Sequence, residues 1–188
     1  MELSGATDEV VAQAVANGDA DAFGILVRRY EEKMLRYARK FLFQSSDIQD
    51  VVQEVFVKAY VNIKSFDASR RFSPWLYRIA HNEFINAGRK FKSLPVFAFD
   101  LDALFPHLPA KETADENYRR KEIKDLLEKY LAKLSPKYRE PLILYYIEEM
   151  SYKEIADILK IPVATVGIRL KRGKDTLSEL MEKEKGQH

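Results

Sequence analysis

Apolar residues recur every three or four positions along most of the chain, which is the spacing that gives a helix one apolar face. The clearest stripe occupies residues 23–41, and others occupy residues 48–63, 75–84 and 123–134. The most continuously apolar run is residues 142–147, where a buried helix is expected. No segment has the convincing alternation of a half-buried strand. The pattern therefore predicts an all-α fold.

Capping residues and prolines indicate where these helices begin and end. Most of the predicted helices are preceded by a cap residue: Thr7 or Asp8, Asp19 or Asp21, Ser46 with Gln49, Ser73 with Pro74, and Ser135 with Pro136. The first helix is expected to end at Asn17-Gly18, and the helix that follows Ser73 is expected to end near Gly88. Pro141 lies inside a later helix, where it should cause a kink or a late start.

Residues 151–177 have the pattern of two short helices joined by a tight turn. Ser151 lies three residues before Glu154, which is the spacing of a capping box, and Pro162 is expected to end the helix that begins there. A basic second helix starts by Thr165. Its inward residues are predicted to be Val166, Leu170 and Leu177, with Thr165, Arg169 and Arg172 on a different face. The pattern is that of a DNA-binding helix-turn-helix, and an ordinary helical hairpin with a solvated basic face is the alternative.

Residues 93–117 separate two helical parts of the chain. They carry one Lys against five Asp and Glu, whereas residues 1–92 have a net charge of +2 and residues 118–188 of +4. A flexible tether has no need of the three Phe and two Leu in residues 96–105, so this segment is expected to dock on either domain or on a partner. The predicted architecture is two small helical domains, residues 1–92 and 118–188, joined by an acidic, partly apolar linker, with a C-terminal helix-turn-helix.

Composition excludes several classes of function. The 188 residues include no Cys, the three His have no metal-ligand spacing, and the seven Gly are spread singly instead of forming a phosphate loop. We therefore expect no catalytic residue, no metal and no cofactor, and the protein is not predicted to be an enzyme. Its apolar runs are far shorter than the roughly 20 residues of a bilayer span, and its start lacks the features of a signal peptide. A cytoplasmic protein without membrane insertion is expected.

Basic, aromatic and amide side chains are interleaved in the second half of the first predicted domain: Lys58, Asn62, Arg70, Arg71, Trp75, Tyr77, Arg78, Asn82 and Asn86. Aromatic rings beside cations suit unstacked nucleic-acid bases, at about 1–3 kcal/mol per stacked base. Trp75 is interpreted as a core residue beneath the loop at residues 66–72. Tyr77 and Asn82 are interpreted as functional.

Three motifs resemble those of the extracytoplasmic-function (ECF) sigma factors of bacterial RNA polymerase. Residues 47–60 are similar to the helix that docks on the clamp helices of the polymerase's largest subunit. Residues 72–82 are similar to the family's helix for the −10 promoter element. Residues 134–140 and the turn at residues 161–166 are similar to its −35 domain. The motifs occur in the family's order and cover most of the chain outside the linker.

The resemblance implies a promoter-specificity subunit that binds core RNA polymerase and promoter DNA and is held by an anti-sigma factor. The residues implied to face the polymerase are Asp47, Asp50, Gln53 and Glu54. Those implied at the −10 element are Lys58, Asn62, Phe66, Arg70, Arg71, Tyr77, Arg78 and Asn82. Of these, Lys58, Asn62, Phe66, Tyr77 and Asn82 are implied to line a pocket for an unstacked base, and Arg70 and Arg71 to lie in or beside the loop that holds it. Those implied at the −35 element are Thr165, Ile168, Arg169, Lys171, Arg172 and Lys174.

Two other interpretations stay open. One is a free-standing DNA-binding regulator, which would have no need of the acidic face at residues 47–54. The other is a helical adaptor sequestered by a protein partner, which can also be one state of a sigma factor. The turn of the helix-turn-helix departs from the family pattern at Ala164 and Gly167, and Ile168 beside Gly167 is suited to contact a thymine methyl group.

Overall fold

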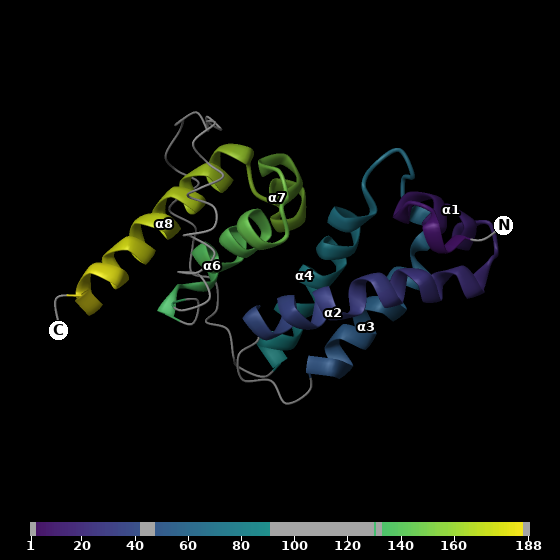
Figure 1. Ribbon diagram of the computed structural model, residues 1–188, viewed down its shortest axis with the longest axis horizontal. Helices are drawn as coiled ribbons and strands as arrows, with labels where there is room; N and C mark the ends of the chain where they lie inside the picture. Colours follow the sequence, from purple (N-terminus) through teal and green to yellow (C-terminus); the bar gives the residue numbers. More distant parts are fainter. Residues whose placement is uncertain (1–2, 42–47, 91–129, 131–132, 186–188) are drawn as a thin grey trace. The chain divides into compact units, whose positions relative to one another are not determined.

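The computed structural model describes residues 3–41, 48–90, 130 and 133–185, and all regular elements in these ranges are helical (Figure 1). This confirms the predicted all-α fold. The chain divides into two compact units, Met1–Leu94 and Pro95–His188. The predicted linker, residues 93–117, lies outside the described residues, as do the predicted capping box at Ser46 and most of the helix predicted at residues 123–134.

The first unit contains α1 (Asp8–Ala16), α2 (Phe23–Phe41), α3 (Ile48–Val61) and α4 (Phe72–Lys90), with short 3₁₀ turns at Leu3–Gly5, Ala20–Ala22 and Ile63–Ser65. Helix α3 packs against both α2 and α4, and α1 packs on α2 and α4. The buried positions follow the predicted helical spacing: Leu26, Tyr30, Met34 and Tyr37 on α2, Val52, Val55, Phe56 and Ala59 on α3, and Leu76, Tyr77, Ala80 and Phe84 on α4. One core therefore lies beneath the surface formed by α3 and α4.

The helix starts at Thr7 and Asp19 are confirmed. Thr7 caps α1 by accepting a hydrogen bond from Val10 N, and Asp19 accepts one from Ala22 N. Gly18, just after α1, has a φ of 110°, a conformation that glycine adopts without steric strain.

The predicted start of α4 at Ser73 is wrong, because the helix begins one residue earlier, at Phe72. Its first N–H is satisfied from a distant part of the chain: Phe72 N donates to Glu9 Oε1 at 3.0 Å. An acceptor 63 residues away replaces the local cap residue, and no local pattern reveals it. The helix also continues two residues beyond Gly88, to Lys90.

The second unit contains α6 (Pro136–Leu142), a π-helical turn η6 (Ile143–Ile147), α7 (Tyr152–Leu159) and α8 (Val163–Lys185). Helix α6 begins at Pro136, so the alternative of a late start at Pro141 is wrong. The α-helical pattern instead ends one residue after Pro141 and continues as the π-helical turn. In the run predicted to be buried, residues 142–147, the first five residues are buried and Ile147 is half-buried.

The helix-turn-helix of α7 and α8 is present. The capping box is confirmed, since Ser151 Oγ accepts from Glu154 N at 3.3 Å and Ser151 N donates to Glu154 Oε2 at 2.8 Å. Pro162 was predicted to end α7, but the helix ends earlier, at Leu159, because Lys160 adopts a left-handed conformation with a φ of 54°. Helix α8 packs closely on α6 at Gly173, where a Cβ atom would lie 2.7 Å from Leu142 Cδ1.

Candidate nucleic-acid interface

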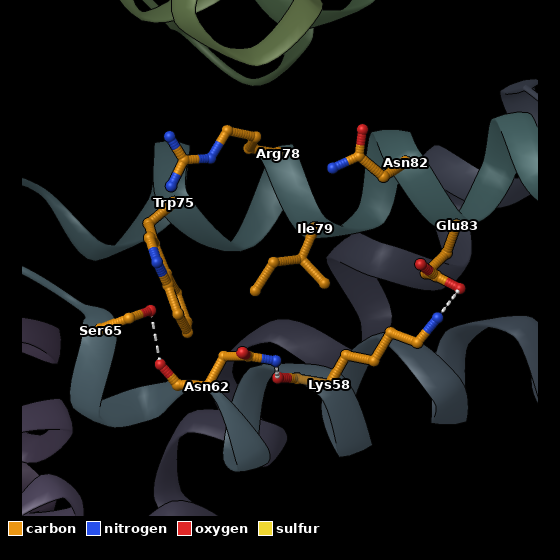
Figure 2. Close-up of a pocket in the computed structure, with 8 residues that line it drawn as sticks. All are labelled: Lys58, Asn62, Ser65, Trp75, Arg78, Ile79, Asn82 and Glu83. Atoms are coloured by element: carbon orange, nitrogen blue, oxygen red, sulfur yellow. Dashed lines mark hydrogen bonds and ion pairs between the residues drawn. The ribbon is translucent and has the colours of Figure 1, made fainter.

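A pocket of about 280 Å³ lies between α3 and α4 (Figure 2). Lys58 enters it from the last turn of α3, and Asn62 and Ser65 come from the turn that follows. The other lining side chains are spaced three or four residues apart on one face of α4: Trp75, Arg78, Ile79, Asn82 and Glu83. We call this the α3–α4 pocket.

Polar contacts hold the α3 side of the pocket in place. Lys58 Nζ donates to Glu83 Oε2 at 2.6 Å across the two helices. The side-chain amide of Asn62 donates to the Lys58 carbonyl at 2.8 Å, and Ser65 Oγ donates to the Asn62 carbonyl at 2.7 Å. The hydrogen bond to Glu83 raises the pKa of Lys58 above its ordinary value.

The indole of Trp75 forms an aromatic wall. In Figure 2 its ring reaches from α4 toward Asn62 and Ser65. Its centroid lies 5.5 Å from that of Phe66 and 5.5 Å from that of Phe72, which support the ring outside the pocket lining. Trp75 is half-buried, so the predicted core role and a role in the pocket coexist in one side chain. A flat, partly exposed ring beside cations and amides can stack on a base and bind its polar edge.

The structure separates the residues predicted for this part of the chain. Four of them line the α3–α4 pocket: Lys58, Asn62, Arg78 and Asn82. Phe66 contacts Trp75 and does not line the pocket. Arg70 and Arg71 are exposed just before α4 begins, and Arg70 Nε lies 3.9 Å from an Asp67 carboxylate oxygen.

Tyr77 is in the core, contrary to its predicted place around the pocket. It is 1% exposed, and its ring centroid lies 5.1 Å from that of Tyr37 on α2. The physical reason is helical spacing, because Tyr77 is followed after three and seven residues by the buried Ala80 and Phe84. That spacing was available in the sequence.

Four lining residues were not among those predicted to bind the −10 element: Ser65, Trp75, Ile79 and Glu83. Ile79 and Glu83 follow Trp75 at intervals of four, so the helical period could have found them once Trp75 was placed in the pocket. The contact of Glu83 with Lys58 spans 25 residues and has no local signal.

A separate surface on α3 carries the residues predicted to face the polymerase. Asp50, Gln53 and Glu54 are exposed there, whereas Asp47 lies outside the described residues. Beside them a groove of about 670 Å³ runs between α2 and α3. Val57 and Tyr60 contribute to its lining although they are 49% and 44% exposed. Polar side chains next to exposed apolar ones are typical of a protein-binding surface.

On α8 the predicted DNA-binding residues differ in exposure. Lys171 and Arg172 are exposed, and Ile168 and Lys174 are half-buried. Thr165 and Arg169 are 4% and 7% exposed, although they were predicted to lie on a face away from the inward residues. Val166, Leu170 and Leu177 are buried as predicted. The inward side of α8 is therefore wider than the apolar stripe alone indicates.

Among the described residues, no group of three or more His, Asp or Glu is placed to hold a metal ion. Within the same residues, no helix is both long and apolar enough to cross a membrane.

Comparisons with known proteins agree with this arrangement. The family described as Sigma-70 region 2 matches residues 26–93, and the family described as Sigma-70, region 4 matches residues 124–177. The ECF RNA polymerase sigma factor SigW of Bacillus subtilis is 37% identical over 171 residues, which are 87% of this chain and 90% of that protein. The ECF RNA polymerase sigma-E factor of Escherichia coli K12 is 32% identical over 182 residues, 94% of this chain and 95% of that protein.

Solved structures are similar to most of the chain. CnrH, in complex with the cytosolic domain of CnrY, is 30% identical with a TM-score of 0.67 over 94% of this chain and 97% of that one. The sigma factor RpoE of Bartonella quintana, in complex with the anti-sigma factor NepR, is 24% identical with a TM-score of 0.59 over 85% and 96%. The second likeness concerns the fold alone.

Proposed function

Because this chain belongs to the ECF sigma factors of RNA polymerase, and so directs promoter-specific initiation of transcription, we propose that its α3–α4 pocket captures an unpaired base of the −10 promoter element. The observation that carries the proposal is the pocket itself, in which Lys58, Asn62 and Asn82 line the same cavity as the ring of Trp75, within the segment matched by Sigma-70 region 2. The protein then supplies binding energy to the opened strand and needs no catalytic group of its own.

The chemistry of the pocket suits a base that has left the duplex. Trp75 offers a stacking surface, and the amide of Asn82 can both donate to and accept from a base edge. Arg78 is exposed at the same face of α4 and is suited to a neighbouring phosphate. Capture of an unstacked base stabilises strand separation without direct contact to duplex base pairs.

We assign the −35 element to α8. Lys171 and Arg172 are exposed and can contact DNA directly, while Lys174 is suited to a phosphate and Ile168 to a thymine methyl. Thr165 and Arg169 remain predicted contacts. Both side chains are buried in the chain without DNA, so Arg169→Ala tests whether Arg169 binds a base. If Arg169 binds a base, this variant should weaken −35 binding by about 1–3 kcal/mol. Unchanged affinity would remove it from the interface.

The polymerase contact is proposed for the exposed face of α3, at Asp50, Gln53 and Glu54 together with Asp47. Its partner would be the clamp helices of the largest subunit of core RNA polymerase. We also propose an anti-sigma factor as a regulatory partner, as the family resemblance implies. In support, CnrH, which is 30% identical to this chain, was solved in complex with a second protein, the cytosolic domain of CnrY. Residues 1–92 would form the polymerase and −10 domain, residues 93–117 the linker and residues 118–188 the −35 domain, and the protein would act in the cytoplasm beside the polymerase.

Run-off transcription tests the function. The purified chain is added to core RNA polymerase with fragmented genomic DNA, and transcripts that depend on the chain are mapped to their promoters. Promoter-dependent transcripts that carry one shared pair of −10 and −35 elements are expected. A complete lack of such transcripts, together with DNA binding by the chain alone, would instead support a free-standing regulator.

A further inference from the structure

Asp8 and Glu9 are neighbouring carboxylates in the first turn of α1. They contact Tyr30 and Phe72, the residues that lie behind Trp75 as seen from the pocket. Glu9 Oε1 accepts a hydrogen bond from Phe72 N at 3.0 Å. Asp8 Oδ2 accepts one from the Tyr30 hydroxyl at 2.6 Å, and Asp8 Oδ1 forms an ion pair with Arg29 at 2.7 Å. Helix α1 is thus tied to both α2 and the start of α4.

The start of α4 needs such a partner. The first N–H groups of a helix have no acceptor within the helix and are usually satisfied by a Ser, Thr, Asp or Asn just before it. Here Arg70 and Arg71 precede α4, and an Arg side chain has no acceptor atom. The Glu9 carboxylate supplies the acceptor, and its negative charge also suits the positive end of the α4 dipole.

Phe72 connects this contact to the pocket. Its ring is 1% exposed and lies between Tyr30, at a centroid distance of 5.5 Å, and Trp75, also at 5.5 Å. Glu9 therefore holds the backbone of Phe72, while Asp8 holds the Tyr30 ring that packs against its side chain. A shift of Phe72 would move Trp75, which lines the pocket three residues further along α4.

We propose that Glu9 is a positioning residue for base capture: by fixing the first N–H of α4, it sets the place of Trp75 in the α3–α4 pocket. The role rests on the proposed function of that pocket. Glu9 itself does not line the pocket. The inference gives α1, which lies outside the segment matched by Sigma-70 region 2, a part in promoter opening.

The test uses holoenzyme assembled from the full chain and core RNA polymerase. The probe is a fluorescent single strand that carries the −10 sequence of a promoter mapped by run-off transcription. Glu9→Ala is expected to lower the affinity for this strand by up to about fivefold, which corresponds to the typical size of a lost helix cap. Glu9→Gln should stay within about twofold of the parent, because its amide oxygen can still accept from Phe72 N.

Two controls separate positioning from charge and from stability. Glu32→Ala removes a carboxylate that is 87% exposed on α2 and should change nothing. Val15→Ala removes buried side-chain atoms from α1 without touching the Glu9 contact, so it should lower the melting temperature with a smaller loss of affinity for the strand.

The proposal is wrong if Glu9→Ala leaves the strand affinity unchanged, as Glu32→Ala should, or if Glu9→Gln binds the strand as weakly as Glu9→Ala. It is also wrong if Val15→Ala, at the same melting temperature as Glu9→Ala, loses as much strand affinity. In each of these cases base capture stands as long as Asn82→Ala still weakens binding of the −10 single strand. If Asn82→Ala has no effect either, base capture fails and the role of Glu9 fails with it.

Discussion

Asn82 and Asn86 are exposed one helical turn apart on α4, but only Asn82 lines the α3–α4 pocket. This pair isolates the contribution of the pocket from that of the helix surface. Asn82→Ala should weaken binding of the −10 single strand by about 1 kcal/mol, roughly fivefold, because it removes hydrogen bonds to a base edge. Asn86→Ala should leave it unchanged. Fluorescence anisotropy with holoenzyme measures both, and equal effects would place the base elsewhere.

The ion pair between Lys58 and Glu83 should leave a signature in the pH dependence of stability. The hydrogen bond to Glu83 raises the pKa of Lys58 in the folded chain. The resulting stabilisation is fully present below the ordinary lysine pKa of about 10.4 and is lost as the pH rises through the raised value.

We therefore expect the difference in unfolding free energy between the parent and Glu83→Gln to be constant near neutral pH and to shrink in strongly alkaline solution. Urea unfolding across this pH range measures that difference in unfolding free energy. Contributions from groups that titrate equally in both proteins cancel when the difference is taken. Glu54→Gln is the control, since Glu54 Oε1 lies 3.7 Å from Lys58 Nζ against 2.6 Å for Glu83. A larger effect from Glu54→Gln would contradict the assignment.

At the residue scale, the sequence predicted side chains whose role follows from local spacing and missed those defined by long-range contacts. Lys58, Asn62 and Asn82 were found because polar residues at helical intervals flank one loop. Glu83 was missed because its partner lies 25 residues away. Tyr77 was assigned to the pocket through the family resemblance, although its helical spacing to Ala80 and Phe84 indicates the core.

Two glycines within helices allow a prediction about helix packing. A Cβ at Gly24 in α2 would approach only the flexible end of Arg28, at 3.4 Å, whereas one at Gly173 in α8 would lie 2.7 Å from Leu142 Cδ1. Gly24→Ala should therefore stabilise the first unit by up to about 1 kcal/mol, because alanine favours the helix.

Gly173→Ala should instead destabilise the second unit by about 1 kcal/mol. The overlap with the fully buried Leu142 is expected to cost about 1–3 kcal/mol, which exceeds the gain in helix propensity. Thermal unfolding of each variant followed by circular dichroism checks the opposite signs. A stabilised Gly173→Ala would mean that α6 and α8 separate easily, and that Leu142 can be repacked.

At the scale of elements, helix starts were predicted where the cap is local. Thr7, Asp19 and Ser151 each accept from an N–H three residues ahead, so their signals lie within one turn. The start of α4 was misplaced because its acceptor comes from α1. The end of α7 was misplaced because Lys160 adopts a left-handed conformation, which a non-glycine residue adopts only when its surroundings require it.

For the whole molecule, the net charge of +2 is too small to explain DNA binding by itself, so binding must depend on where the charges lie. Lys171 and Arg172 are exposed on α8 in one unit, and Arg78 is exposed on α4 in the other. Under the proposed assignment, each unit binds one promoter element. The two contacts should therefore contribute separately to affinity for a complete promoter.

A double-mutant cycle tests this separation. Because Asn82 and Arg172 belong to different units, their losses in promoter affinity should add to within about 0.5 kcal/mol. Asn82→Ala combined with Lys58→Ala is the matched cycle inside one pocket, and it should deviate from additivity by more, because both side chains line the same cavity. Equilibrium competition on duplex promoter, with holoenzyme in both cycles, supplies the numbers. Coupling between Asn82 and Arg172 as large as that inside the pocket would mean that −35 binding and −10 opening are one cooperative event, and that the two units do not act independently.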